Sequence, residues 1–206
     1  MIEVQSPTYF VPNWPAPPSV SCAITLRSGG VSKEPFLSNN LATHVGDDFL
    51  SVKINRERLR KQLSLPEEPR WLHQLHSSRV IHSSDISKDN RADGTVSKTR
   101  GEVCVVLTAD CVPILIYDNK IKMIAAIHAG WKGAFKGIIT KVIKFMVKKG
   151  CKLENITAVV GPSISQKNYE VKDDFRKRFI QKDKKNYIFF KNKKNRLYFD
   201  LTKFIY

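Results

Sequence analysis

A cysteine and a histidine stand where apolar runs of the chain stop. Cys111 follows Asp110 in "TADCVPILIYD", and His128 ends the apolar run of "KMIAAIHAGWKG". Thiolate and imidazole are both ligands for zinc and related transition metals. A catalytic zinc site takes three protein ligands and keeps a fourth position for water, so a third ligand must come from another segment. The remaining histidines are the candidates, namely His44, His73, His76 and His82.

The segment "WLHQLHSS" offers two of these histidines, His73 and His76. In an extended strand they lie on opposite faces, so we expect only one to point at the site. No HExxH or CxxC spacing supports a metal site, and structural roles stay open, because a buried cysteine is commonly a core residue. A metal-free hydrolase with Cys111 as nucleophile and His128 as base is a further alternative.

The residues after His128 are typical of an anion-binding site. "AGWKG" separates an apolar strand from a helical pattern, so its backbone N–H groups lie at a helix N-terminus, where phosphate binds in many proteins. Gly130 lets a ligand approach the backbone, and Lys132 adds a positive charge.

Helical and strand patterns alternate along the chain and must position these residues. Apolar spacing predicts helices over 47–65, with Asp47 or Asp48 as the N-cap, over 133–150 and over 173–182. Strands are predicted over 23–27, 69–84 with an irregular middle, 102–118, 120–130 and 154–164, and a hairpin over 186–201 that turns at "KNKKN". Residues 83–100 are polar and are expected to be exposed.

These elements predict a single-domain α/β fold with a mixed sheet, without internal repeats or a clear linker. A chain of 206 residues with 42% hydrophobic residues suits one ordinary core. The N-terminus has no signal-peptide pattern, and no apolar stretch is long enough for a membrane helix. We therefore expect a cytoplasmic protein, with no membrane association, in which all four cysteines are free thiols.

The net charge of +16 is concentrated in the C-terminal part. Residues 132–206 hold 20 Lys and Arg against 6 Asp and Glu, whereas residues 1–131 hold 15 against 13. Such a region attracts polyanions. Because the lysines are scattered without interleaved aromatic residues, we favour a solvated surface and do not expect nucleic acid as a partner. No partner protein is evident from the sequence.

An ordered series of motifs resembles one family, the bacterial YfiH type of laccase-domain proteins, also called polyphenol oxidase or purine nucleoside phosphorylase. The motifs include "PNWPAPPSV", "TLRSGGVS", "NNLATHVGDD", "WLHQLHS", "RADGTV", "LTADCVPILIYD", "AAIHAGWKG" and "VVGPSISQKNYEV". The resemblance implies an α/β sandwich with a surface pocket. It also implies that His76, Cys111 and His128 are zinc ligands and that His73 and His82 are structural or surface residues.

Members of this family are similar to enzymes that cleave purine nucleosides with phosphate and deaminate adenosine. The resemblance therefore implies purine nucleosides and phosphate as substrates, with His76, Cys111, His128 and Asp110 as the catalytic set. Asp110 is expected to orient a ligating histidine. Gly130, Lys132 and Arg56 are expected to bind phosphate, and further pocket candidates are Asn40, His44, Gln74 and Asp93.

Three departures from the family pattern bear on this expectation. Ser77 stands where the family usually has glycine, and Lys132 replaces an arginine, which loses the two-pronged phosphate grip. Family members also continue past the "DL" motif near residue 200, so residues 1–206 are expected to form one laccase domain without its usual C-terminal segment.

Three other functions remain open. A copper-dependent phenol oxidase of the laccase type needs many imidazoles, and five histidines without a His-x-His pair do not supply a three-copper cluster, although copper can occupy the zinc site. The metal-free hydrolase would act on cell-wall precursors, a role attributed to some relatives. A polyanion-binding protein would use the basic C-terminal part.

Overall fold

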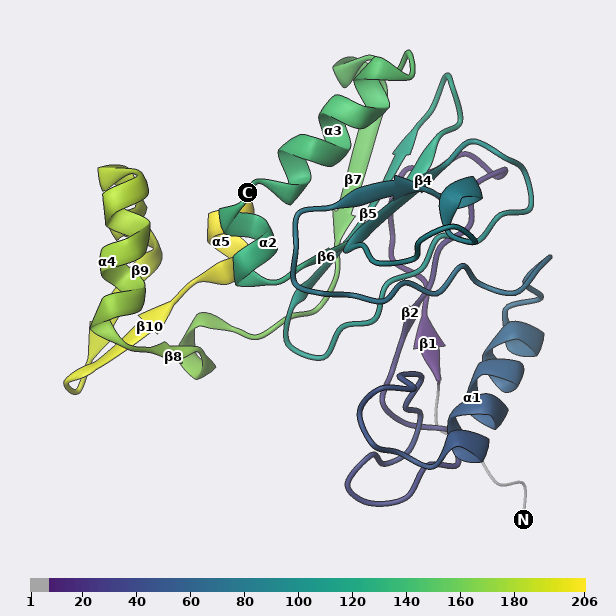
Figure 1. The fold of residues 1–206 in the computed structure, drawn as a ribbon, viewed down its shortest axis with the longest axis horizontal. Helices are drawn as coiled ribbons and strands as arrows, with labels where there is room; N and C mark the ends of the chain where they lie inside the picture. The colour runs from purple at the N-terminus through teal and green to yellow at the C-terminus, as the bar shows by residue number, and fades with distance from the viewer. Residues whose placement is uncertain (1–7) are drawn as a thin grey trace.

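A mixed sheet forms the centre of the molecule in the computed structural model, which describes residues 8–206 (Figure 1). The strand order is β3-β4-β6-β5-β7. β3 and β4 are parallel, and every other neighbouring pair is antiparallel. The strands are β3 (Val80–His82), β4 (Gly94–Ser97), β5 (Val112–Asp118), β6 (Ile124–Ala129) and β7 (Ile156–Val160).

The central strands are buried on both faces, which explains why β5 and β6 are almost continuously apolar. Helix α3 (Ile138–Lys148) covers one face of the sheet (Figure 1). Its buried residues Ile138, Val142 and Met146 are spaced by four, so they form one stripe against β4 and β6. Thus the periodicity over 133–150 correctly predicts an amphipathic helix above the sheet.

That predicted helix is divided in the structure. A short helix α2 (Trp131–Phe135) comes directly after β6, and α3 begins three residues after it ends. Gly137 lies between them with φ of 75°. This left-handed conformation cannot continue a helix, and glycine adopts it at little cost. The break lets α2 leave the rim of the sheet in its own direction.

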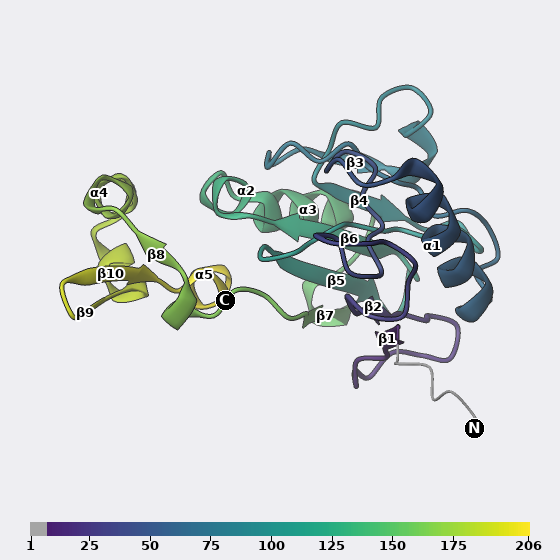
Figure 2. The same ribbon diagram turned by 90° about the horizontal axis from the view of Figure 1, so that it is seen from below.

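Helix α1 (Phe49–Gln62) and the strand pair β1 (Tyr9–Phe10) and β2 (Ile24–Thr25) lie at one end of the molecule, and residues 170–199 form the other end (Figures 1 and 2). Of the two capping candidates, Asp48 caps α1, because its carboxylate accepts a hydrogen bond from the backbone N–H of Ser51 at 2.8 Å. Asn55 is buried in this part and donates to three oxygen atoms of the preceding loop.

The C-terminal residues form a second sheet, of order β8-β10-β9, with α4 beside it (Figure 2). The predicted hairpin is confirmed, and Lys194 and Asn195 at its turn both have positive φ, as a tight hairpin requires. The elements are β8 (Glu170–Val171), α4 (Asp173–Lys182), β9 (Phe190–Lys193), β10 (Arg196–Phe199) and α5 (Leu201–Ile205).

Aromatic side chains join this second sheet to the main one. Phe179 of α4 and Phe199 of β10 are fully buried and share one hydrophobic cluster with Ile127 of the central sheet. The ring of Trp131, at the start of α2, contacts that of Phe175 with centroids 4.9 Å apart. The C-terminal elements therefore support α2 from the side.

Three strand predictions need correction. The predicted strand over 102–118 begins only at Val112, and of the predicted strand over 69–84 only Val80–His82 forms a strand, although Arg70 and His73 make isolated bridges. Residues 83–100 are not all exposed, because β4 lies within them and is fully buried. Of its four residues only Val96 is aliphatic, so the apolar pattern of a buried strand is missing. The polar composition therefore concealed a central strand.

The mixed α/β class predicted from the sequence is confirmed. Among residues 8–206, no helix combines the length and the apolar character that crossing a bilayer requires. The four cysteines are free thiols in the structure, as expected.

Candidate metal centre

Three side chains from separate segments meet at one rim of the main sheet. One ligand atom each of His76, Cys111 and His128 lies within 4.8 Å of the others. The Cys111 Sγ and His76 Nε2 atoms are 3.8 Å apart. Ligands that are about 2.0–2.3 Å from a tetrahedral zinc ion lie roughly 3.3–3.8 Å from one another, so small adjustments would bring all three around one ion. The donor set and its spacing therefore fit a metal.

The sheet register explains why Cys111 and His128 are neighbours. Val112 of β5 pairs with Ala129 of β6, and Pro113 pairs with His128, so the start of β5 and the end of β6 lie side by side. Gly130 follows directly. A Cβ atom on Gly130 would lie 2.8 Å from His76 Cδ2 and 3.0 Å from Cys111 Sγ. Only glycine leaves room for the three side chains to converge.

His76 lies in a loop before β3, with φ of 54°. This left-handed conformation is uncommon for residues with a side chain and needs support from its surroundings. It also means that the extended-strand geometry assumed for His73 and His76 does not hold. The His76 side chain is exposed, Cys111 is half-buried and His128 is buried, so the group opens to solvent on the His76 side.

The carboxylate of Asp93 supports the left-handed conformation of His76 through hydrogen bonds. Its Oδ1 accepts hydrogen bonds from His128 Nδ1 at 2.8 Å and from the backbone N–H of His76 at 2.9 Å. Its Oδ2 accepts from the backbone N–H of Leu75 and from both the N–H and the Oγ of Ser77. Asp93 is completely buried. One carboxylate thus fixes the loop of the first histidine and the ring of the second.

These contacts determine the protonation states of Asp93 and His128. Burial favours the neutral acid of Asp93, but hydrogen bonds from His128, Ser77 and the Leu75 backbone outweigh it and lower its pKa to about 2. Burial likewise disfavours protonated His128, yet hydrogen bonds with Asp93 and Cys111 raise its pKa to about 9. Because Nδ1 of His128 donates to Asp93, Nε2 is the atom left to bind a metal.

The pKa of His76, on the side of the group that opens to solvent, is lowered, whereas that of His128 is raised. Burial lowers the pKa of His76, and positive charge on His128 and Lys132 lowers it further, against the effect of Asp93. A lowered pKa keeps the His76 ring neutral, the form that binds metals. Lys132 is exposed and lies close enough to act on His76 electrostatically, so it is the cation next to the open side.

The role expected of Asp110 belongs to Asp93. Asp110 has an exposed side chain, and the carboxylate that accepts from His128 is that of Asp93. Asp110 instead contributes its backbone carbonyl, which accepts the N–H of Ile164 at 2.9 Å and holds the following segment in place. Sequence reasoning named Asp93 only as a pocket residue, because the long-range pairing of β4 with β6 was not predicted.

Two substrate candidates are occupied with backbone contacts. Arg56 donates from Nε and Nη2 to the carbonyl oxygen of Leu41, and its guanidinium lies 3.8 Å from the ring centroid of Trp71. Gln74 forms two hydrogen bonds with the backbone of Leu107. Each side chain joins two segments of the chain, Arg56 by binding Leu41 and Gln74 by binding Leu107. Each therefore has a structural function that does not depend on a substrate.

The other two substrate candidates, Asn40 and His44, lie in the loop before α1. Asn40 donates to Asp47 at 2.9 Å and closes a turn with Ala42. His44 is exposed in the same loop. Neither is brought into the metal-binding group, so their contact with substrate stays a prediction.

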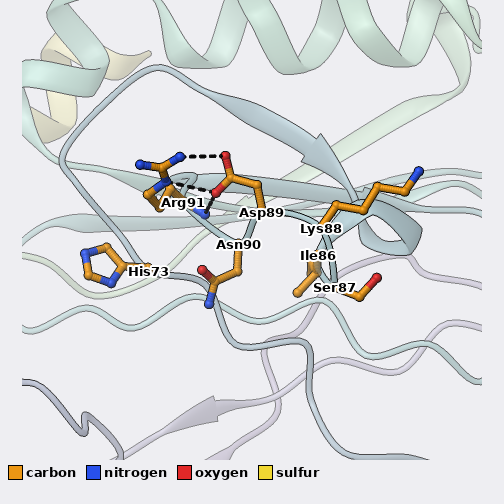
Figure 3. A pocket seen from close by; sticks show the side chains of 7 residues that line it. All are labelled: His73, Ile86, Ser87, Lys88, Asp89, Asn90 and Arg91. Atoms are coloured by element: carbon orange, nitrogen blue, oxygen red, sulfur yellow. Dashed lines mark hydrogen bonds and ion pairs between the residues drawn. The ribbon is translucent and has the colours of Figure 1, made fainter.

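His73 and His82 lie apart from the three converging residues. His73 lines an open hollow of about 620 Å³ together with the loop of residues 86–91 (Figure 3). In this hollow Asp89 forms ion pairs with Arg91 and Arg79. The His82 Nδ1 atom lies 2.9 Å from the hydroxyl of Ser84. Of the candidates for the third ligand, the structure brings only His76 to Cys111 and His128.

Tyr169 was missed by sequence reasoning. Burial and the negative charges of Cys111 and Asp110 raise the pKa of its phenol to about 12, and its ring packs against Phe199 with centroids 5.8 Å apart. It follows the segment that Asp110 anchors, and a tyrosine in a loop gave no signal of its own.

Comparison with known proteins agrees with this site. A family model described as "Multi-copper polyphenol oxidoreductase laccase" matches residues 21–206. The chain belongs to this laccase-domain family. The match includes every residue of the metal-binding group and the Asp93 that orders it.

Curated members of the laccase-domain family are similar over most of this chain. A Haemophilus influenzae protein named purine nucleoside phosphorylase is 39% identical over 174 residues, which are 84% of this chain and 70% of that protein. The Escherichia coli purine nucleoside phosphorylase YfiH is 38% identical over 177 residues, which are 85% of this chain and 72% of that protein.

Solved structures of laccase-domain proteins share the fold. A Neisseria meningitidis protein matches with a TM-score of 0.86 at 34% identity, covering 96% of this chain and 80% of its own. YlmD from Geobacillus stearothermophilus matches with a TM-score of 0.77 at 27% identity, covering 92% of this chain and 76% of its own.

Proposed function

We propose that this chain is a zinc-dependent purine nucleoside phosphorylase that also deaminates adenosine. The observation that carries the proposal is the convergence of His76, Cys111 and His128 on one point that is open to solvent. The names of the curated relatives supply the reaction. We further propose that the chain is one domain and that it acts in the cytoplasm, where the four free thiols would stay reduced.

The donor set favours zinc over copper. Blue-copper sites combine two histidines and a cysteine with a weak axial ligand, commonly methionine. Within residues 8–206 the methionines are Met123 and Met146, and both are buried in the core cluster, outside the group. An exposed His76 leaves space for water or substrate, as in catalytic zinc sites. Bound zinc would supply a Lewis acid and would lower the pKa of a water to about 7 in favourable cases.

Phosphorolysis requires phosphate to attack C1′ of the sugar while the bond to the purine breaks. Lys132 acts electrostatically on His76 and would hold the phosphate. Gly130, expected from the sequence to let phosphate approach the backbone, is buried, and the three candidate ligand side chains fill the space beside it. Since α2 has only five residues, its N-terminus adds little to the charge of Lys132. A tyrosine phenol is protonated at neutral pH, and Tyr169 would donate its proton to the leaving purine.

Deamination replaces the amine at C6 of adenine with the oxygen of water, and the amine leaves as ammonia. It needs an activated water and a group that protonates the amine, but it does not need phosphate. Lys132 should therefore matter for phosphorolysis and not for deamination, which separates the two reactions in one protein.

The test measures adenine, ribose 1-phosphate and ammonia from adenosine, with and without phosphate. We expect phosphate-dependent release of adenine and phosphate-independent release of ammonia. Lys132→Ala should raise the KM for phosphate by at least about fivefold and leave ammonia release unchanged, because one exposed charge contact is lost. Lys144→Ala, on the exposed face of α3, is the matched control. Adenine release that ignores phosphate would contradict the proposal.

A metal-free cysteine hydrolase that acts on cell-wall precursors is the second candidate. Asp93, His128 and Cys111 form the order of contacts seen in cysteine nucleophile sites, in which a carboxylate orients the imidazole beside the thiol. This candidate predicts activity that survives a chelator and is abolished by alkylation of Cys111. The zinc proposal predicts that the chelator alone abolishes activity and that added zinc restores it. Oxygen uptake with a phenol would instead indicate a copper oxidase.

A further inference from the structure

The second sheet has two chemically different faces. Side chains alternate along a strand, so Phe190 and Phe199 point to one face, where they pack into the core beside α4. Lys191, Lys193 and Arg196 point to the other face. The register pairs Arg196 with Lys193 directly across the two strands.

This cationic face lines a hollow of about 530 Å³. Lys167, from a short 3-10 helix (Gln166–Asn168), and the turn residue Lys194 complete its positive rim. One acidic residue lies close, since Glu170 is 3.2 Å from Arg196, but both side chains of that pair are more than half exposed. One carboxylate beside five lysine and arginine side chains leaves this face with a net positive charge.

Like charges directly opposite one another destabilise a sheet. The pairing of Lys193 with Arg196 places two like charges side by side, and binding of an anion between them would relieve their repulsion. Sequence analysis favoured a solvated surface because no aromatic residue is interleaved with the lysines. The fold changes this, because the register places Tyr198 directly across from Lys191, inside the hollow and half-buried.

We propose that this face binds single-stranded nucleic acid. The cations of the hollow contact successive phosphates, and the ring of Tyr198 stacks on a base. Lysine and arginine contacts to phosphate supply most non-specific affinity, and stacking on an aromatic ring adds a contribution that any base can make. A single strand exposes its bases for stacking, whereas a duplex does not, and this favours the single strand over duplex DNA. The site is separate from the metal centre and does not depend on the proposed activity.

The test is fluorescence anisotropy of the full chain with a labelled oligothymidylate of about 12 nucleotides, a length within the usual range of single-strand sites. We expect saturable binding that weakens as salt increases. Lys191→Gln with Lys193→Gln should weaken binding by at least about fivefold and lower the slope of log affinity against log salt by about 1.4, since each lost phosphate contact contributes about 0.7.

The matched control is Lys144→Gln with Lys148→Gln, which removes the same charge from the exposed face of α3. It should leave binding nearly unchanged. Tyr198→Leu should weaken binding by at least about fivefold without changing the salt slope, because stacking releases no counterions. Circular dichroism of each variant verifies folding, and the lysine variants are at exposed positions, so they test the site even if Tyr198→Leu unfolds.

Several results would overturn the proposal. These are absence of binding to the wild type at low salt, equal loss in the site variant and the control, and equal affinity for a duplex of the same charge. Tripolyphosphate that binds the hollow as tightly as the oligonucleotide would assign it to a small polyphosphate instead.

Discussion

A single buried carboxylate decides the geometry of the metal-binding residues. Asp93 accepts hydrogen bonds from a backbone loop on one side and from the His128 ring on the other. The free energy of these contacts opposes the strain of the left-handed His76 and selects the imidazole tautomer that leaves Nε2 of His128 available. Asp93 is therefore a positioning residue for the site.

Asp93→Asn tests this role. The amide keeps the size of the side chain but accepts hydrogen bonds through only one oxygen. We expect zinc affinity to fall by roughly 10- to 100-fold, as for other partners of ligating histidines. Isothermal titration of the metal-free variant with zinc measures this. Asp89→Asn is the control, because Asp89 pairs with Arg79 and Arg91 away from the group. An unchanged affinity in Asp93→Asn would contradict the positioning role.

The pH dependence of metal binding follows from the same contacts. The pKa of His128 in the metal-free protein is raised to about 9, so the ring is protonated at neutral pH and must lose a proton to bind a metal. Deprotonation of His128 should therefore make zinc affinity increase with pH, by nearly tenfold per unit from about pH 7 and less steeply as the pH approaches 9. Competition with a calibrated chelator at each pH measures it. Affinity that is constant over this range would show that His128 binds no metal.

Ser77 stands where the family pattern has glycine, and the structure shows where its side chain lies. Its Oγ donates to Asp93 at 2.6 Å and accepts the N–H of Arg79 at 3.1 Å. The side chain therefore turns inward to the carboxylate, where it is half-buried, and does not close the open side of His76. Serine in place of the family's glycine is thus compatible with the site.

At the scale of elements, the connection from β6 to α2 is the most restricted part of the site. The three candidate ligand side chains surround the space in which a Cβ of residue 130 would lie. Backbone and ring atoms cannot move away there without displacing His76 or Cys111.

Gly130→Ala should therefore reduce zinc affinity by at least about tenfold while the protein remains folded, because the added methyl group must displace a ligand. Equilibrium dialysis against zinc, with thermal unfolding in parallel, separates the two effects. Gly94→Ala is the control, because a Cβ there would lie 3.4 Å from the nearest side-chain atoms, which is ordinary contact. Equal zinc binding in both variants would contradict a metal between these residues.

The sequence predicts helices and strands with a strong local pattern better than it predicts their boundaries and the connections between them. The strand that follows Cys111, the strand that carries His128 and the helix α3 were predictable, because apolar periodicity depends on local sequence. The split at Gly137 and the buried strand β4 were not, because each depends on what packs beside it. For the same reason Asp93 was seen as a polar pocket residue, and its actual contacts required the pairing of β4 with β6.

At the scale of the whole molecule, one hydrophobic cluster extends from the central sheet to the C-terminal elements. Phe179 occupies the middle of an aromatic group that includes Phe135 of α2 and Phe199 of β10. The stability of α2, and with it the position of Lys132, depends on this packing. The mixed α/β class was predictable from element order, whereas this connection was not, since the aromatic residues are far apart in the sequence.

Phe179→Ala should lower the free energy of unfolding by about 3–5 kcal/mol, because it removes a fully buried ring from a packed core. Urea unfolding followed by circular dichroism measures this. Tyr187→Ala removes a ring of similar size at a position that is 65% exposed and should change stability by less than about 0.5 kcal/mol. Equal effects would show that the C-terminal elements do not share the core.

The most direct measurement is the metal content of the chain after dialysis against zinc, for the wild type, Cys111→Ser and Cys22→Ser. Cys22 is also a free thiol but lies outside the group of three, so its variant controls for loss of a cysteine. We predict about one zinc per chain in the wild type and in Cys22→Ser, as expected for a three-ligand site, and little or none in Cys111→Ser. A wild type without zinc, or a Cys111→Ser variant that retains it, would contradict a metal centre formed by His76, Cys111 and His128.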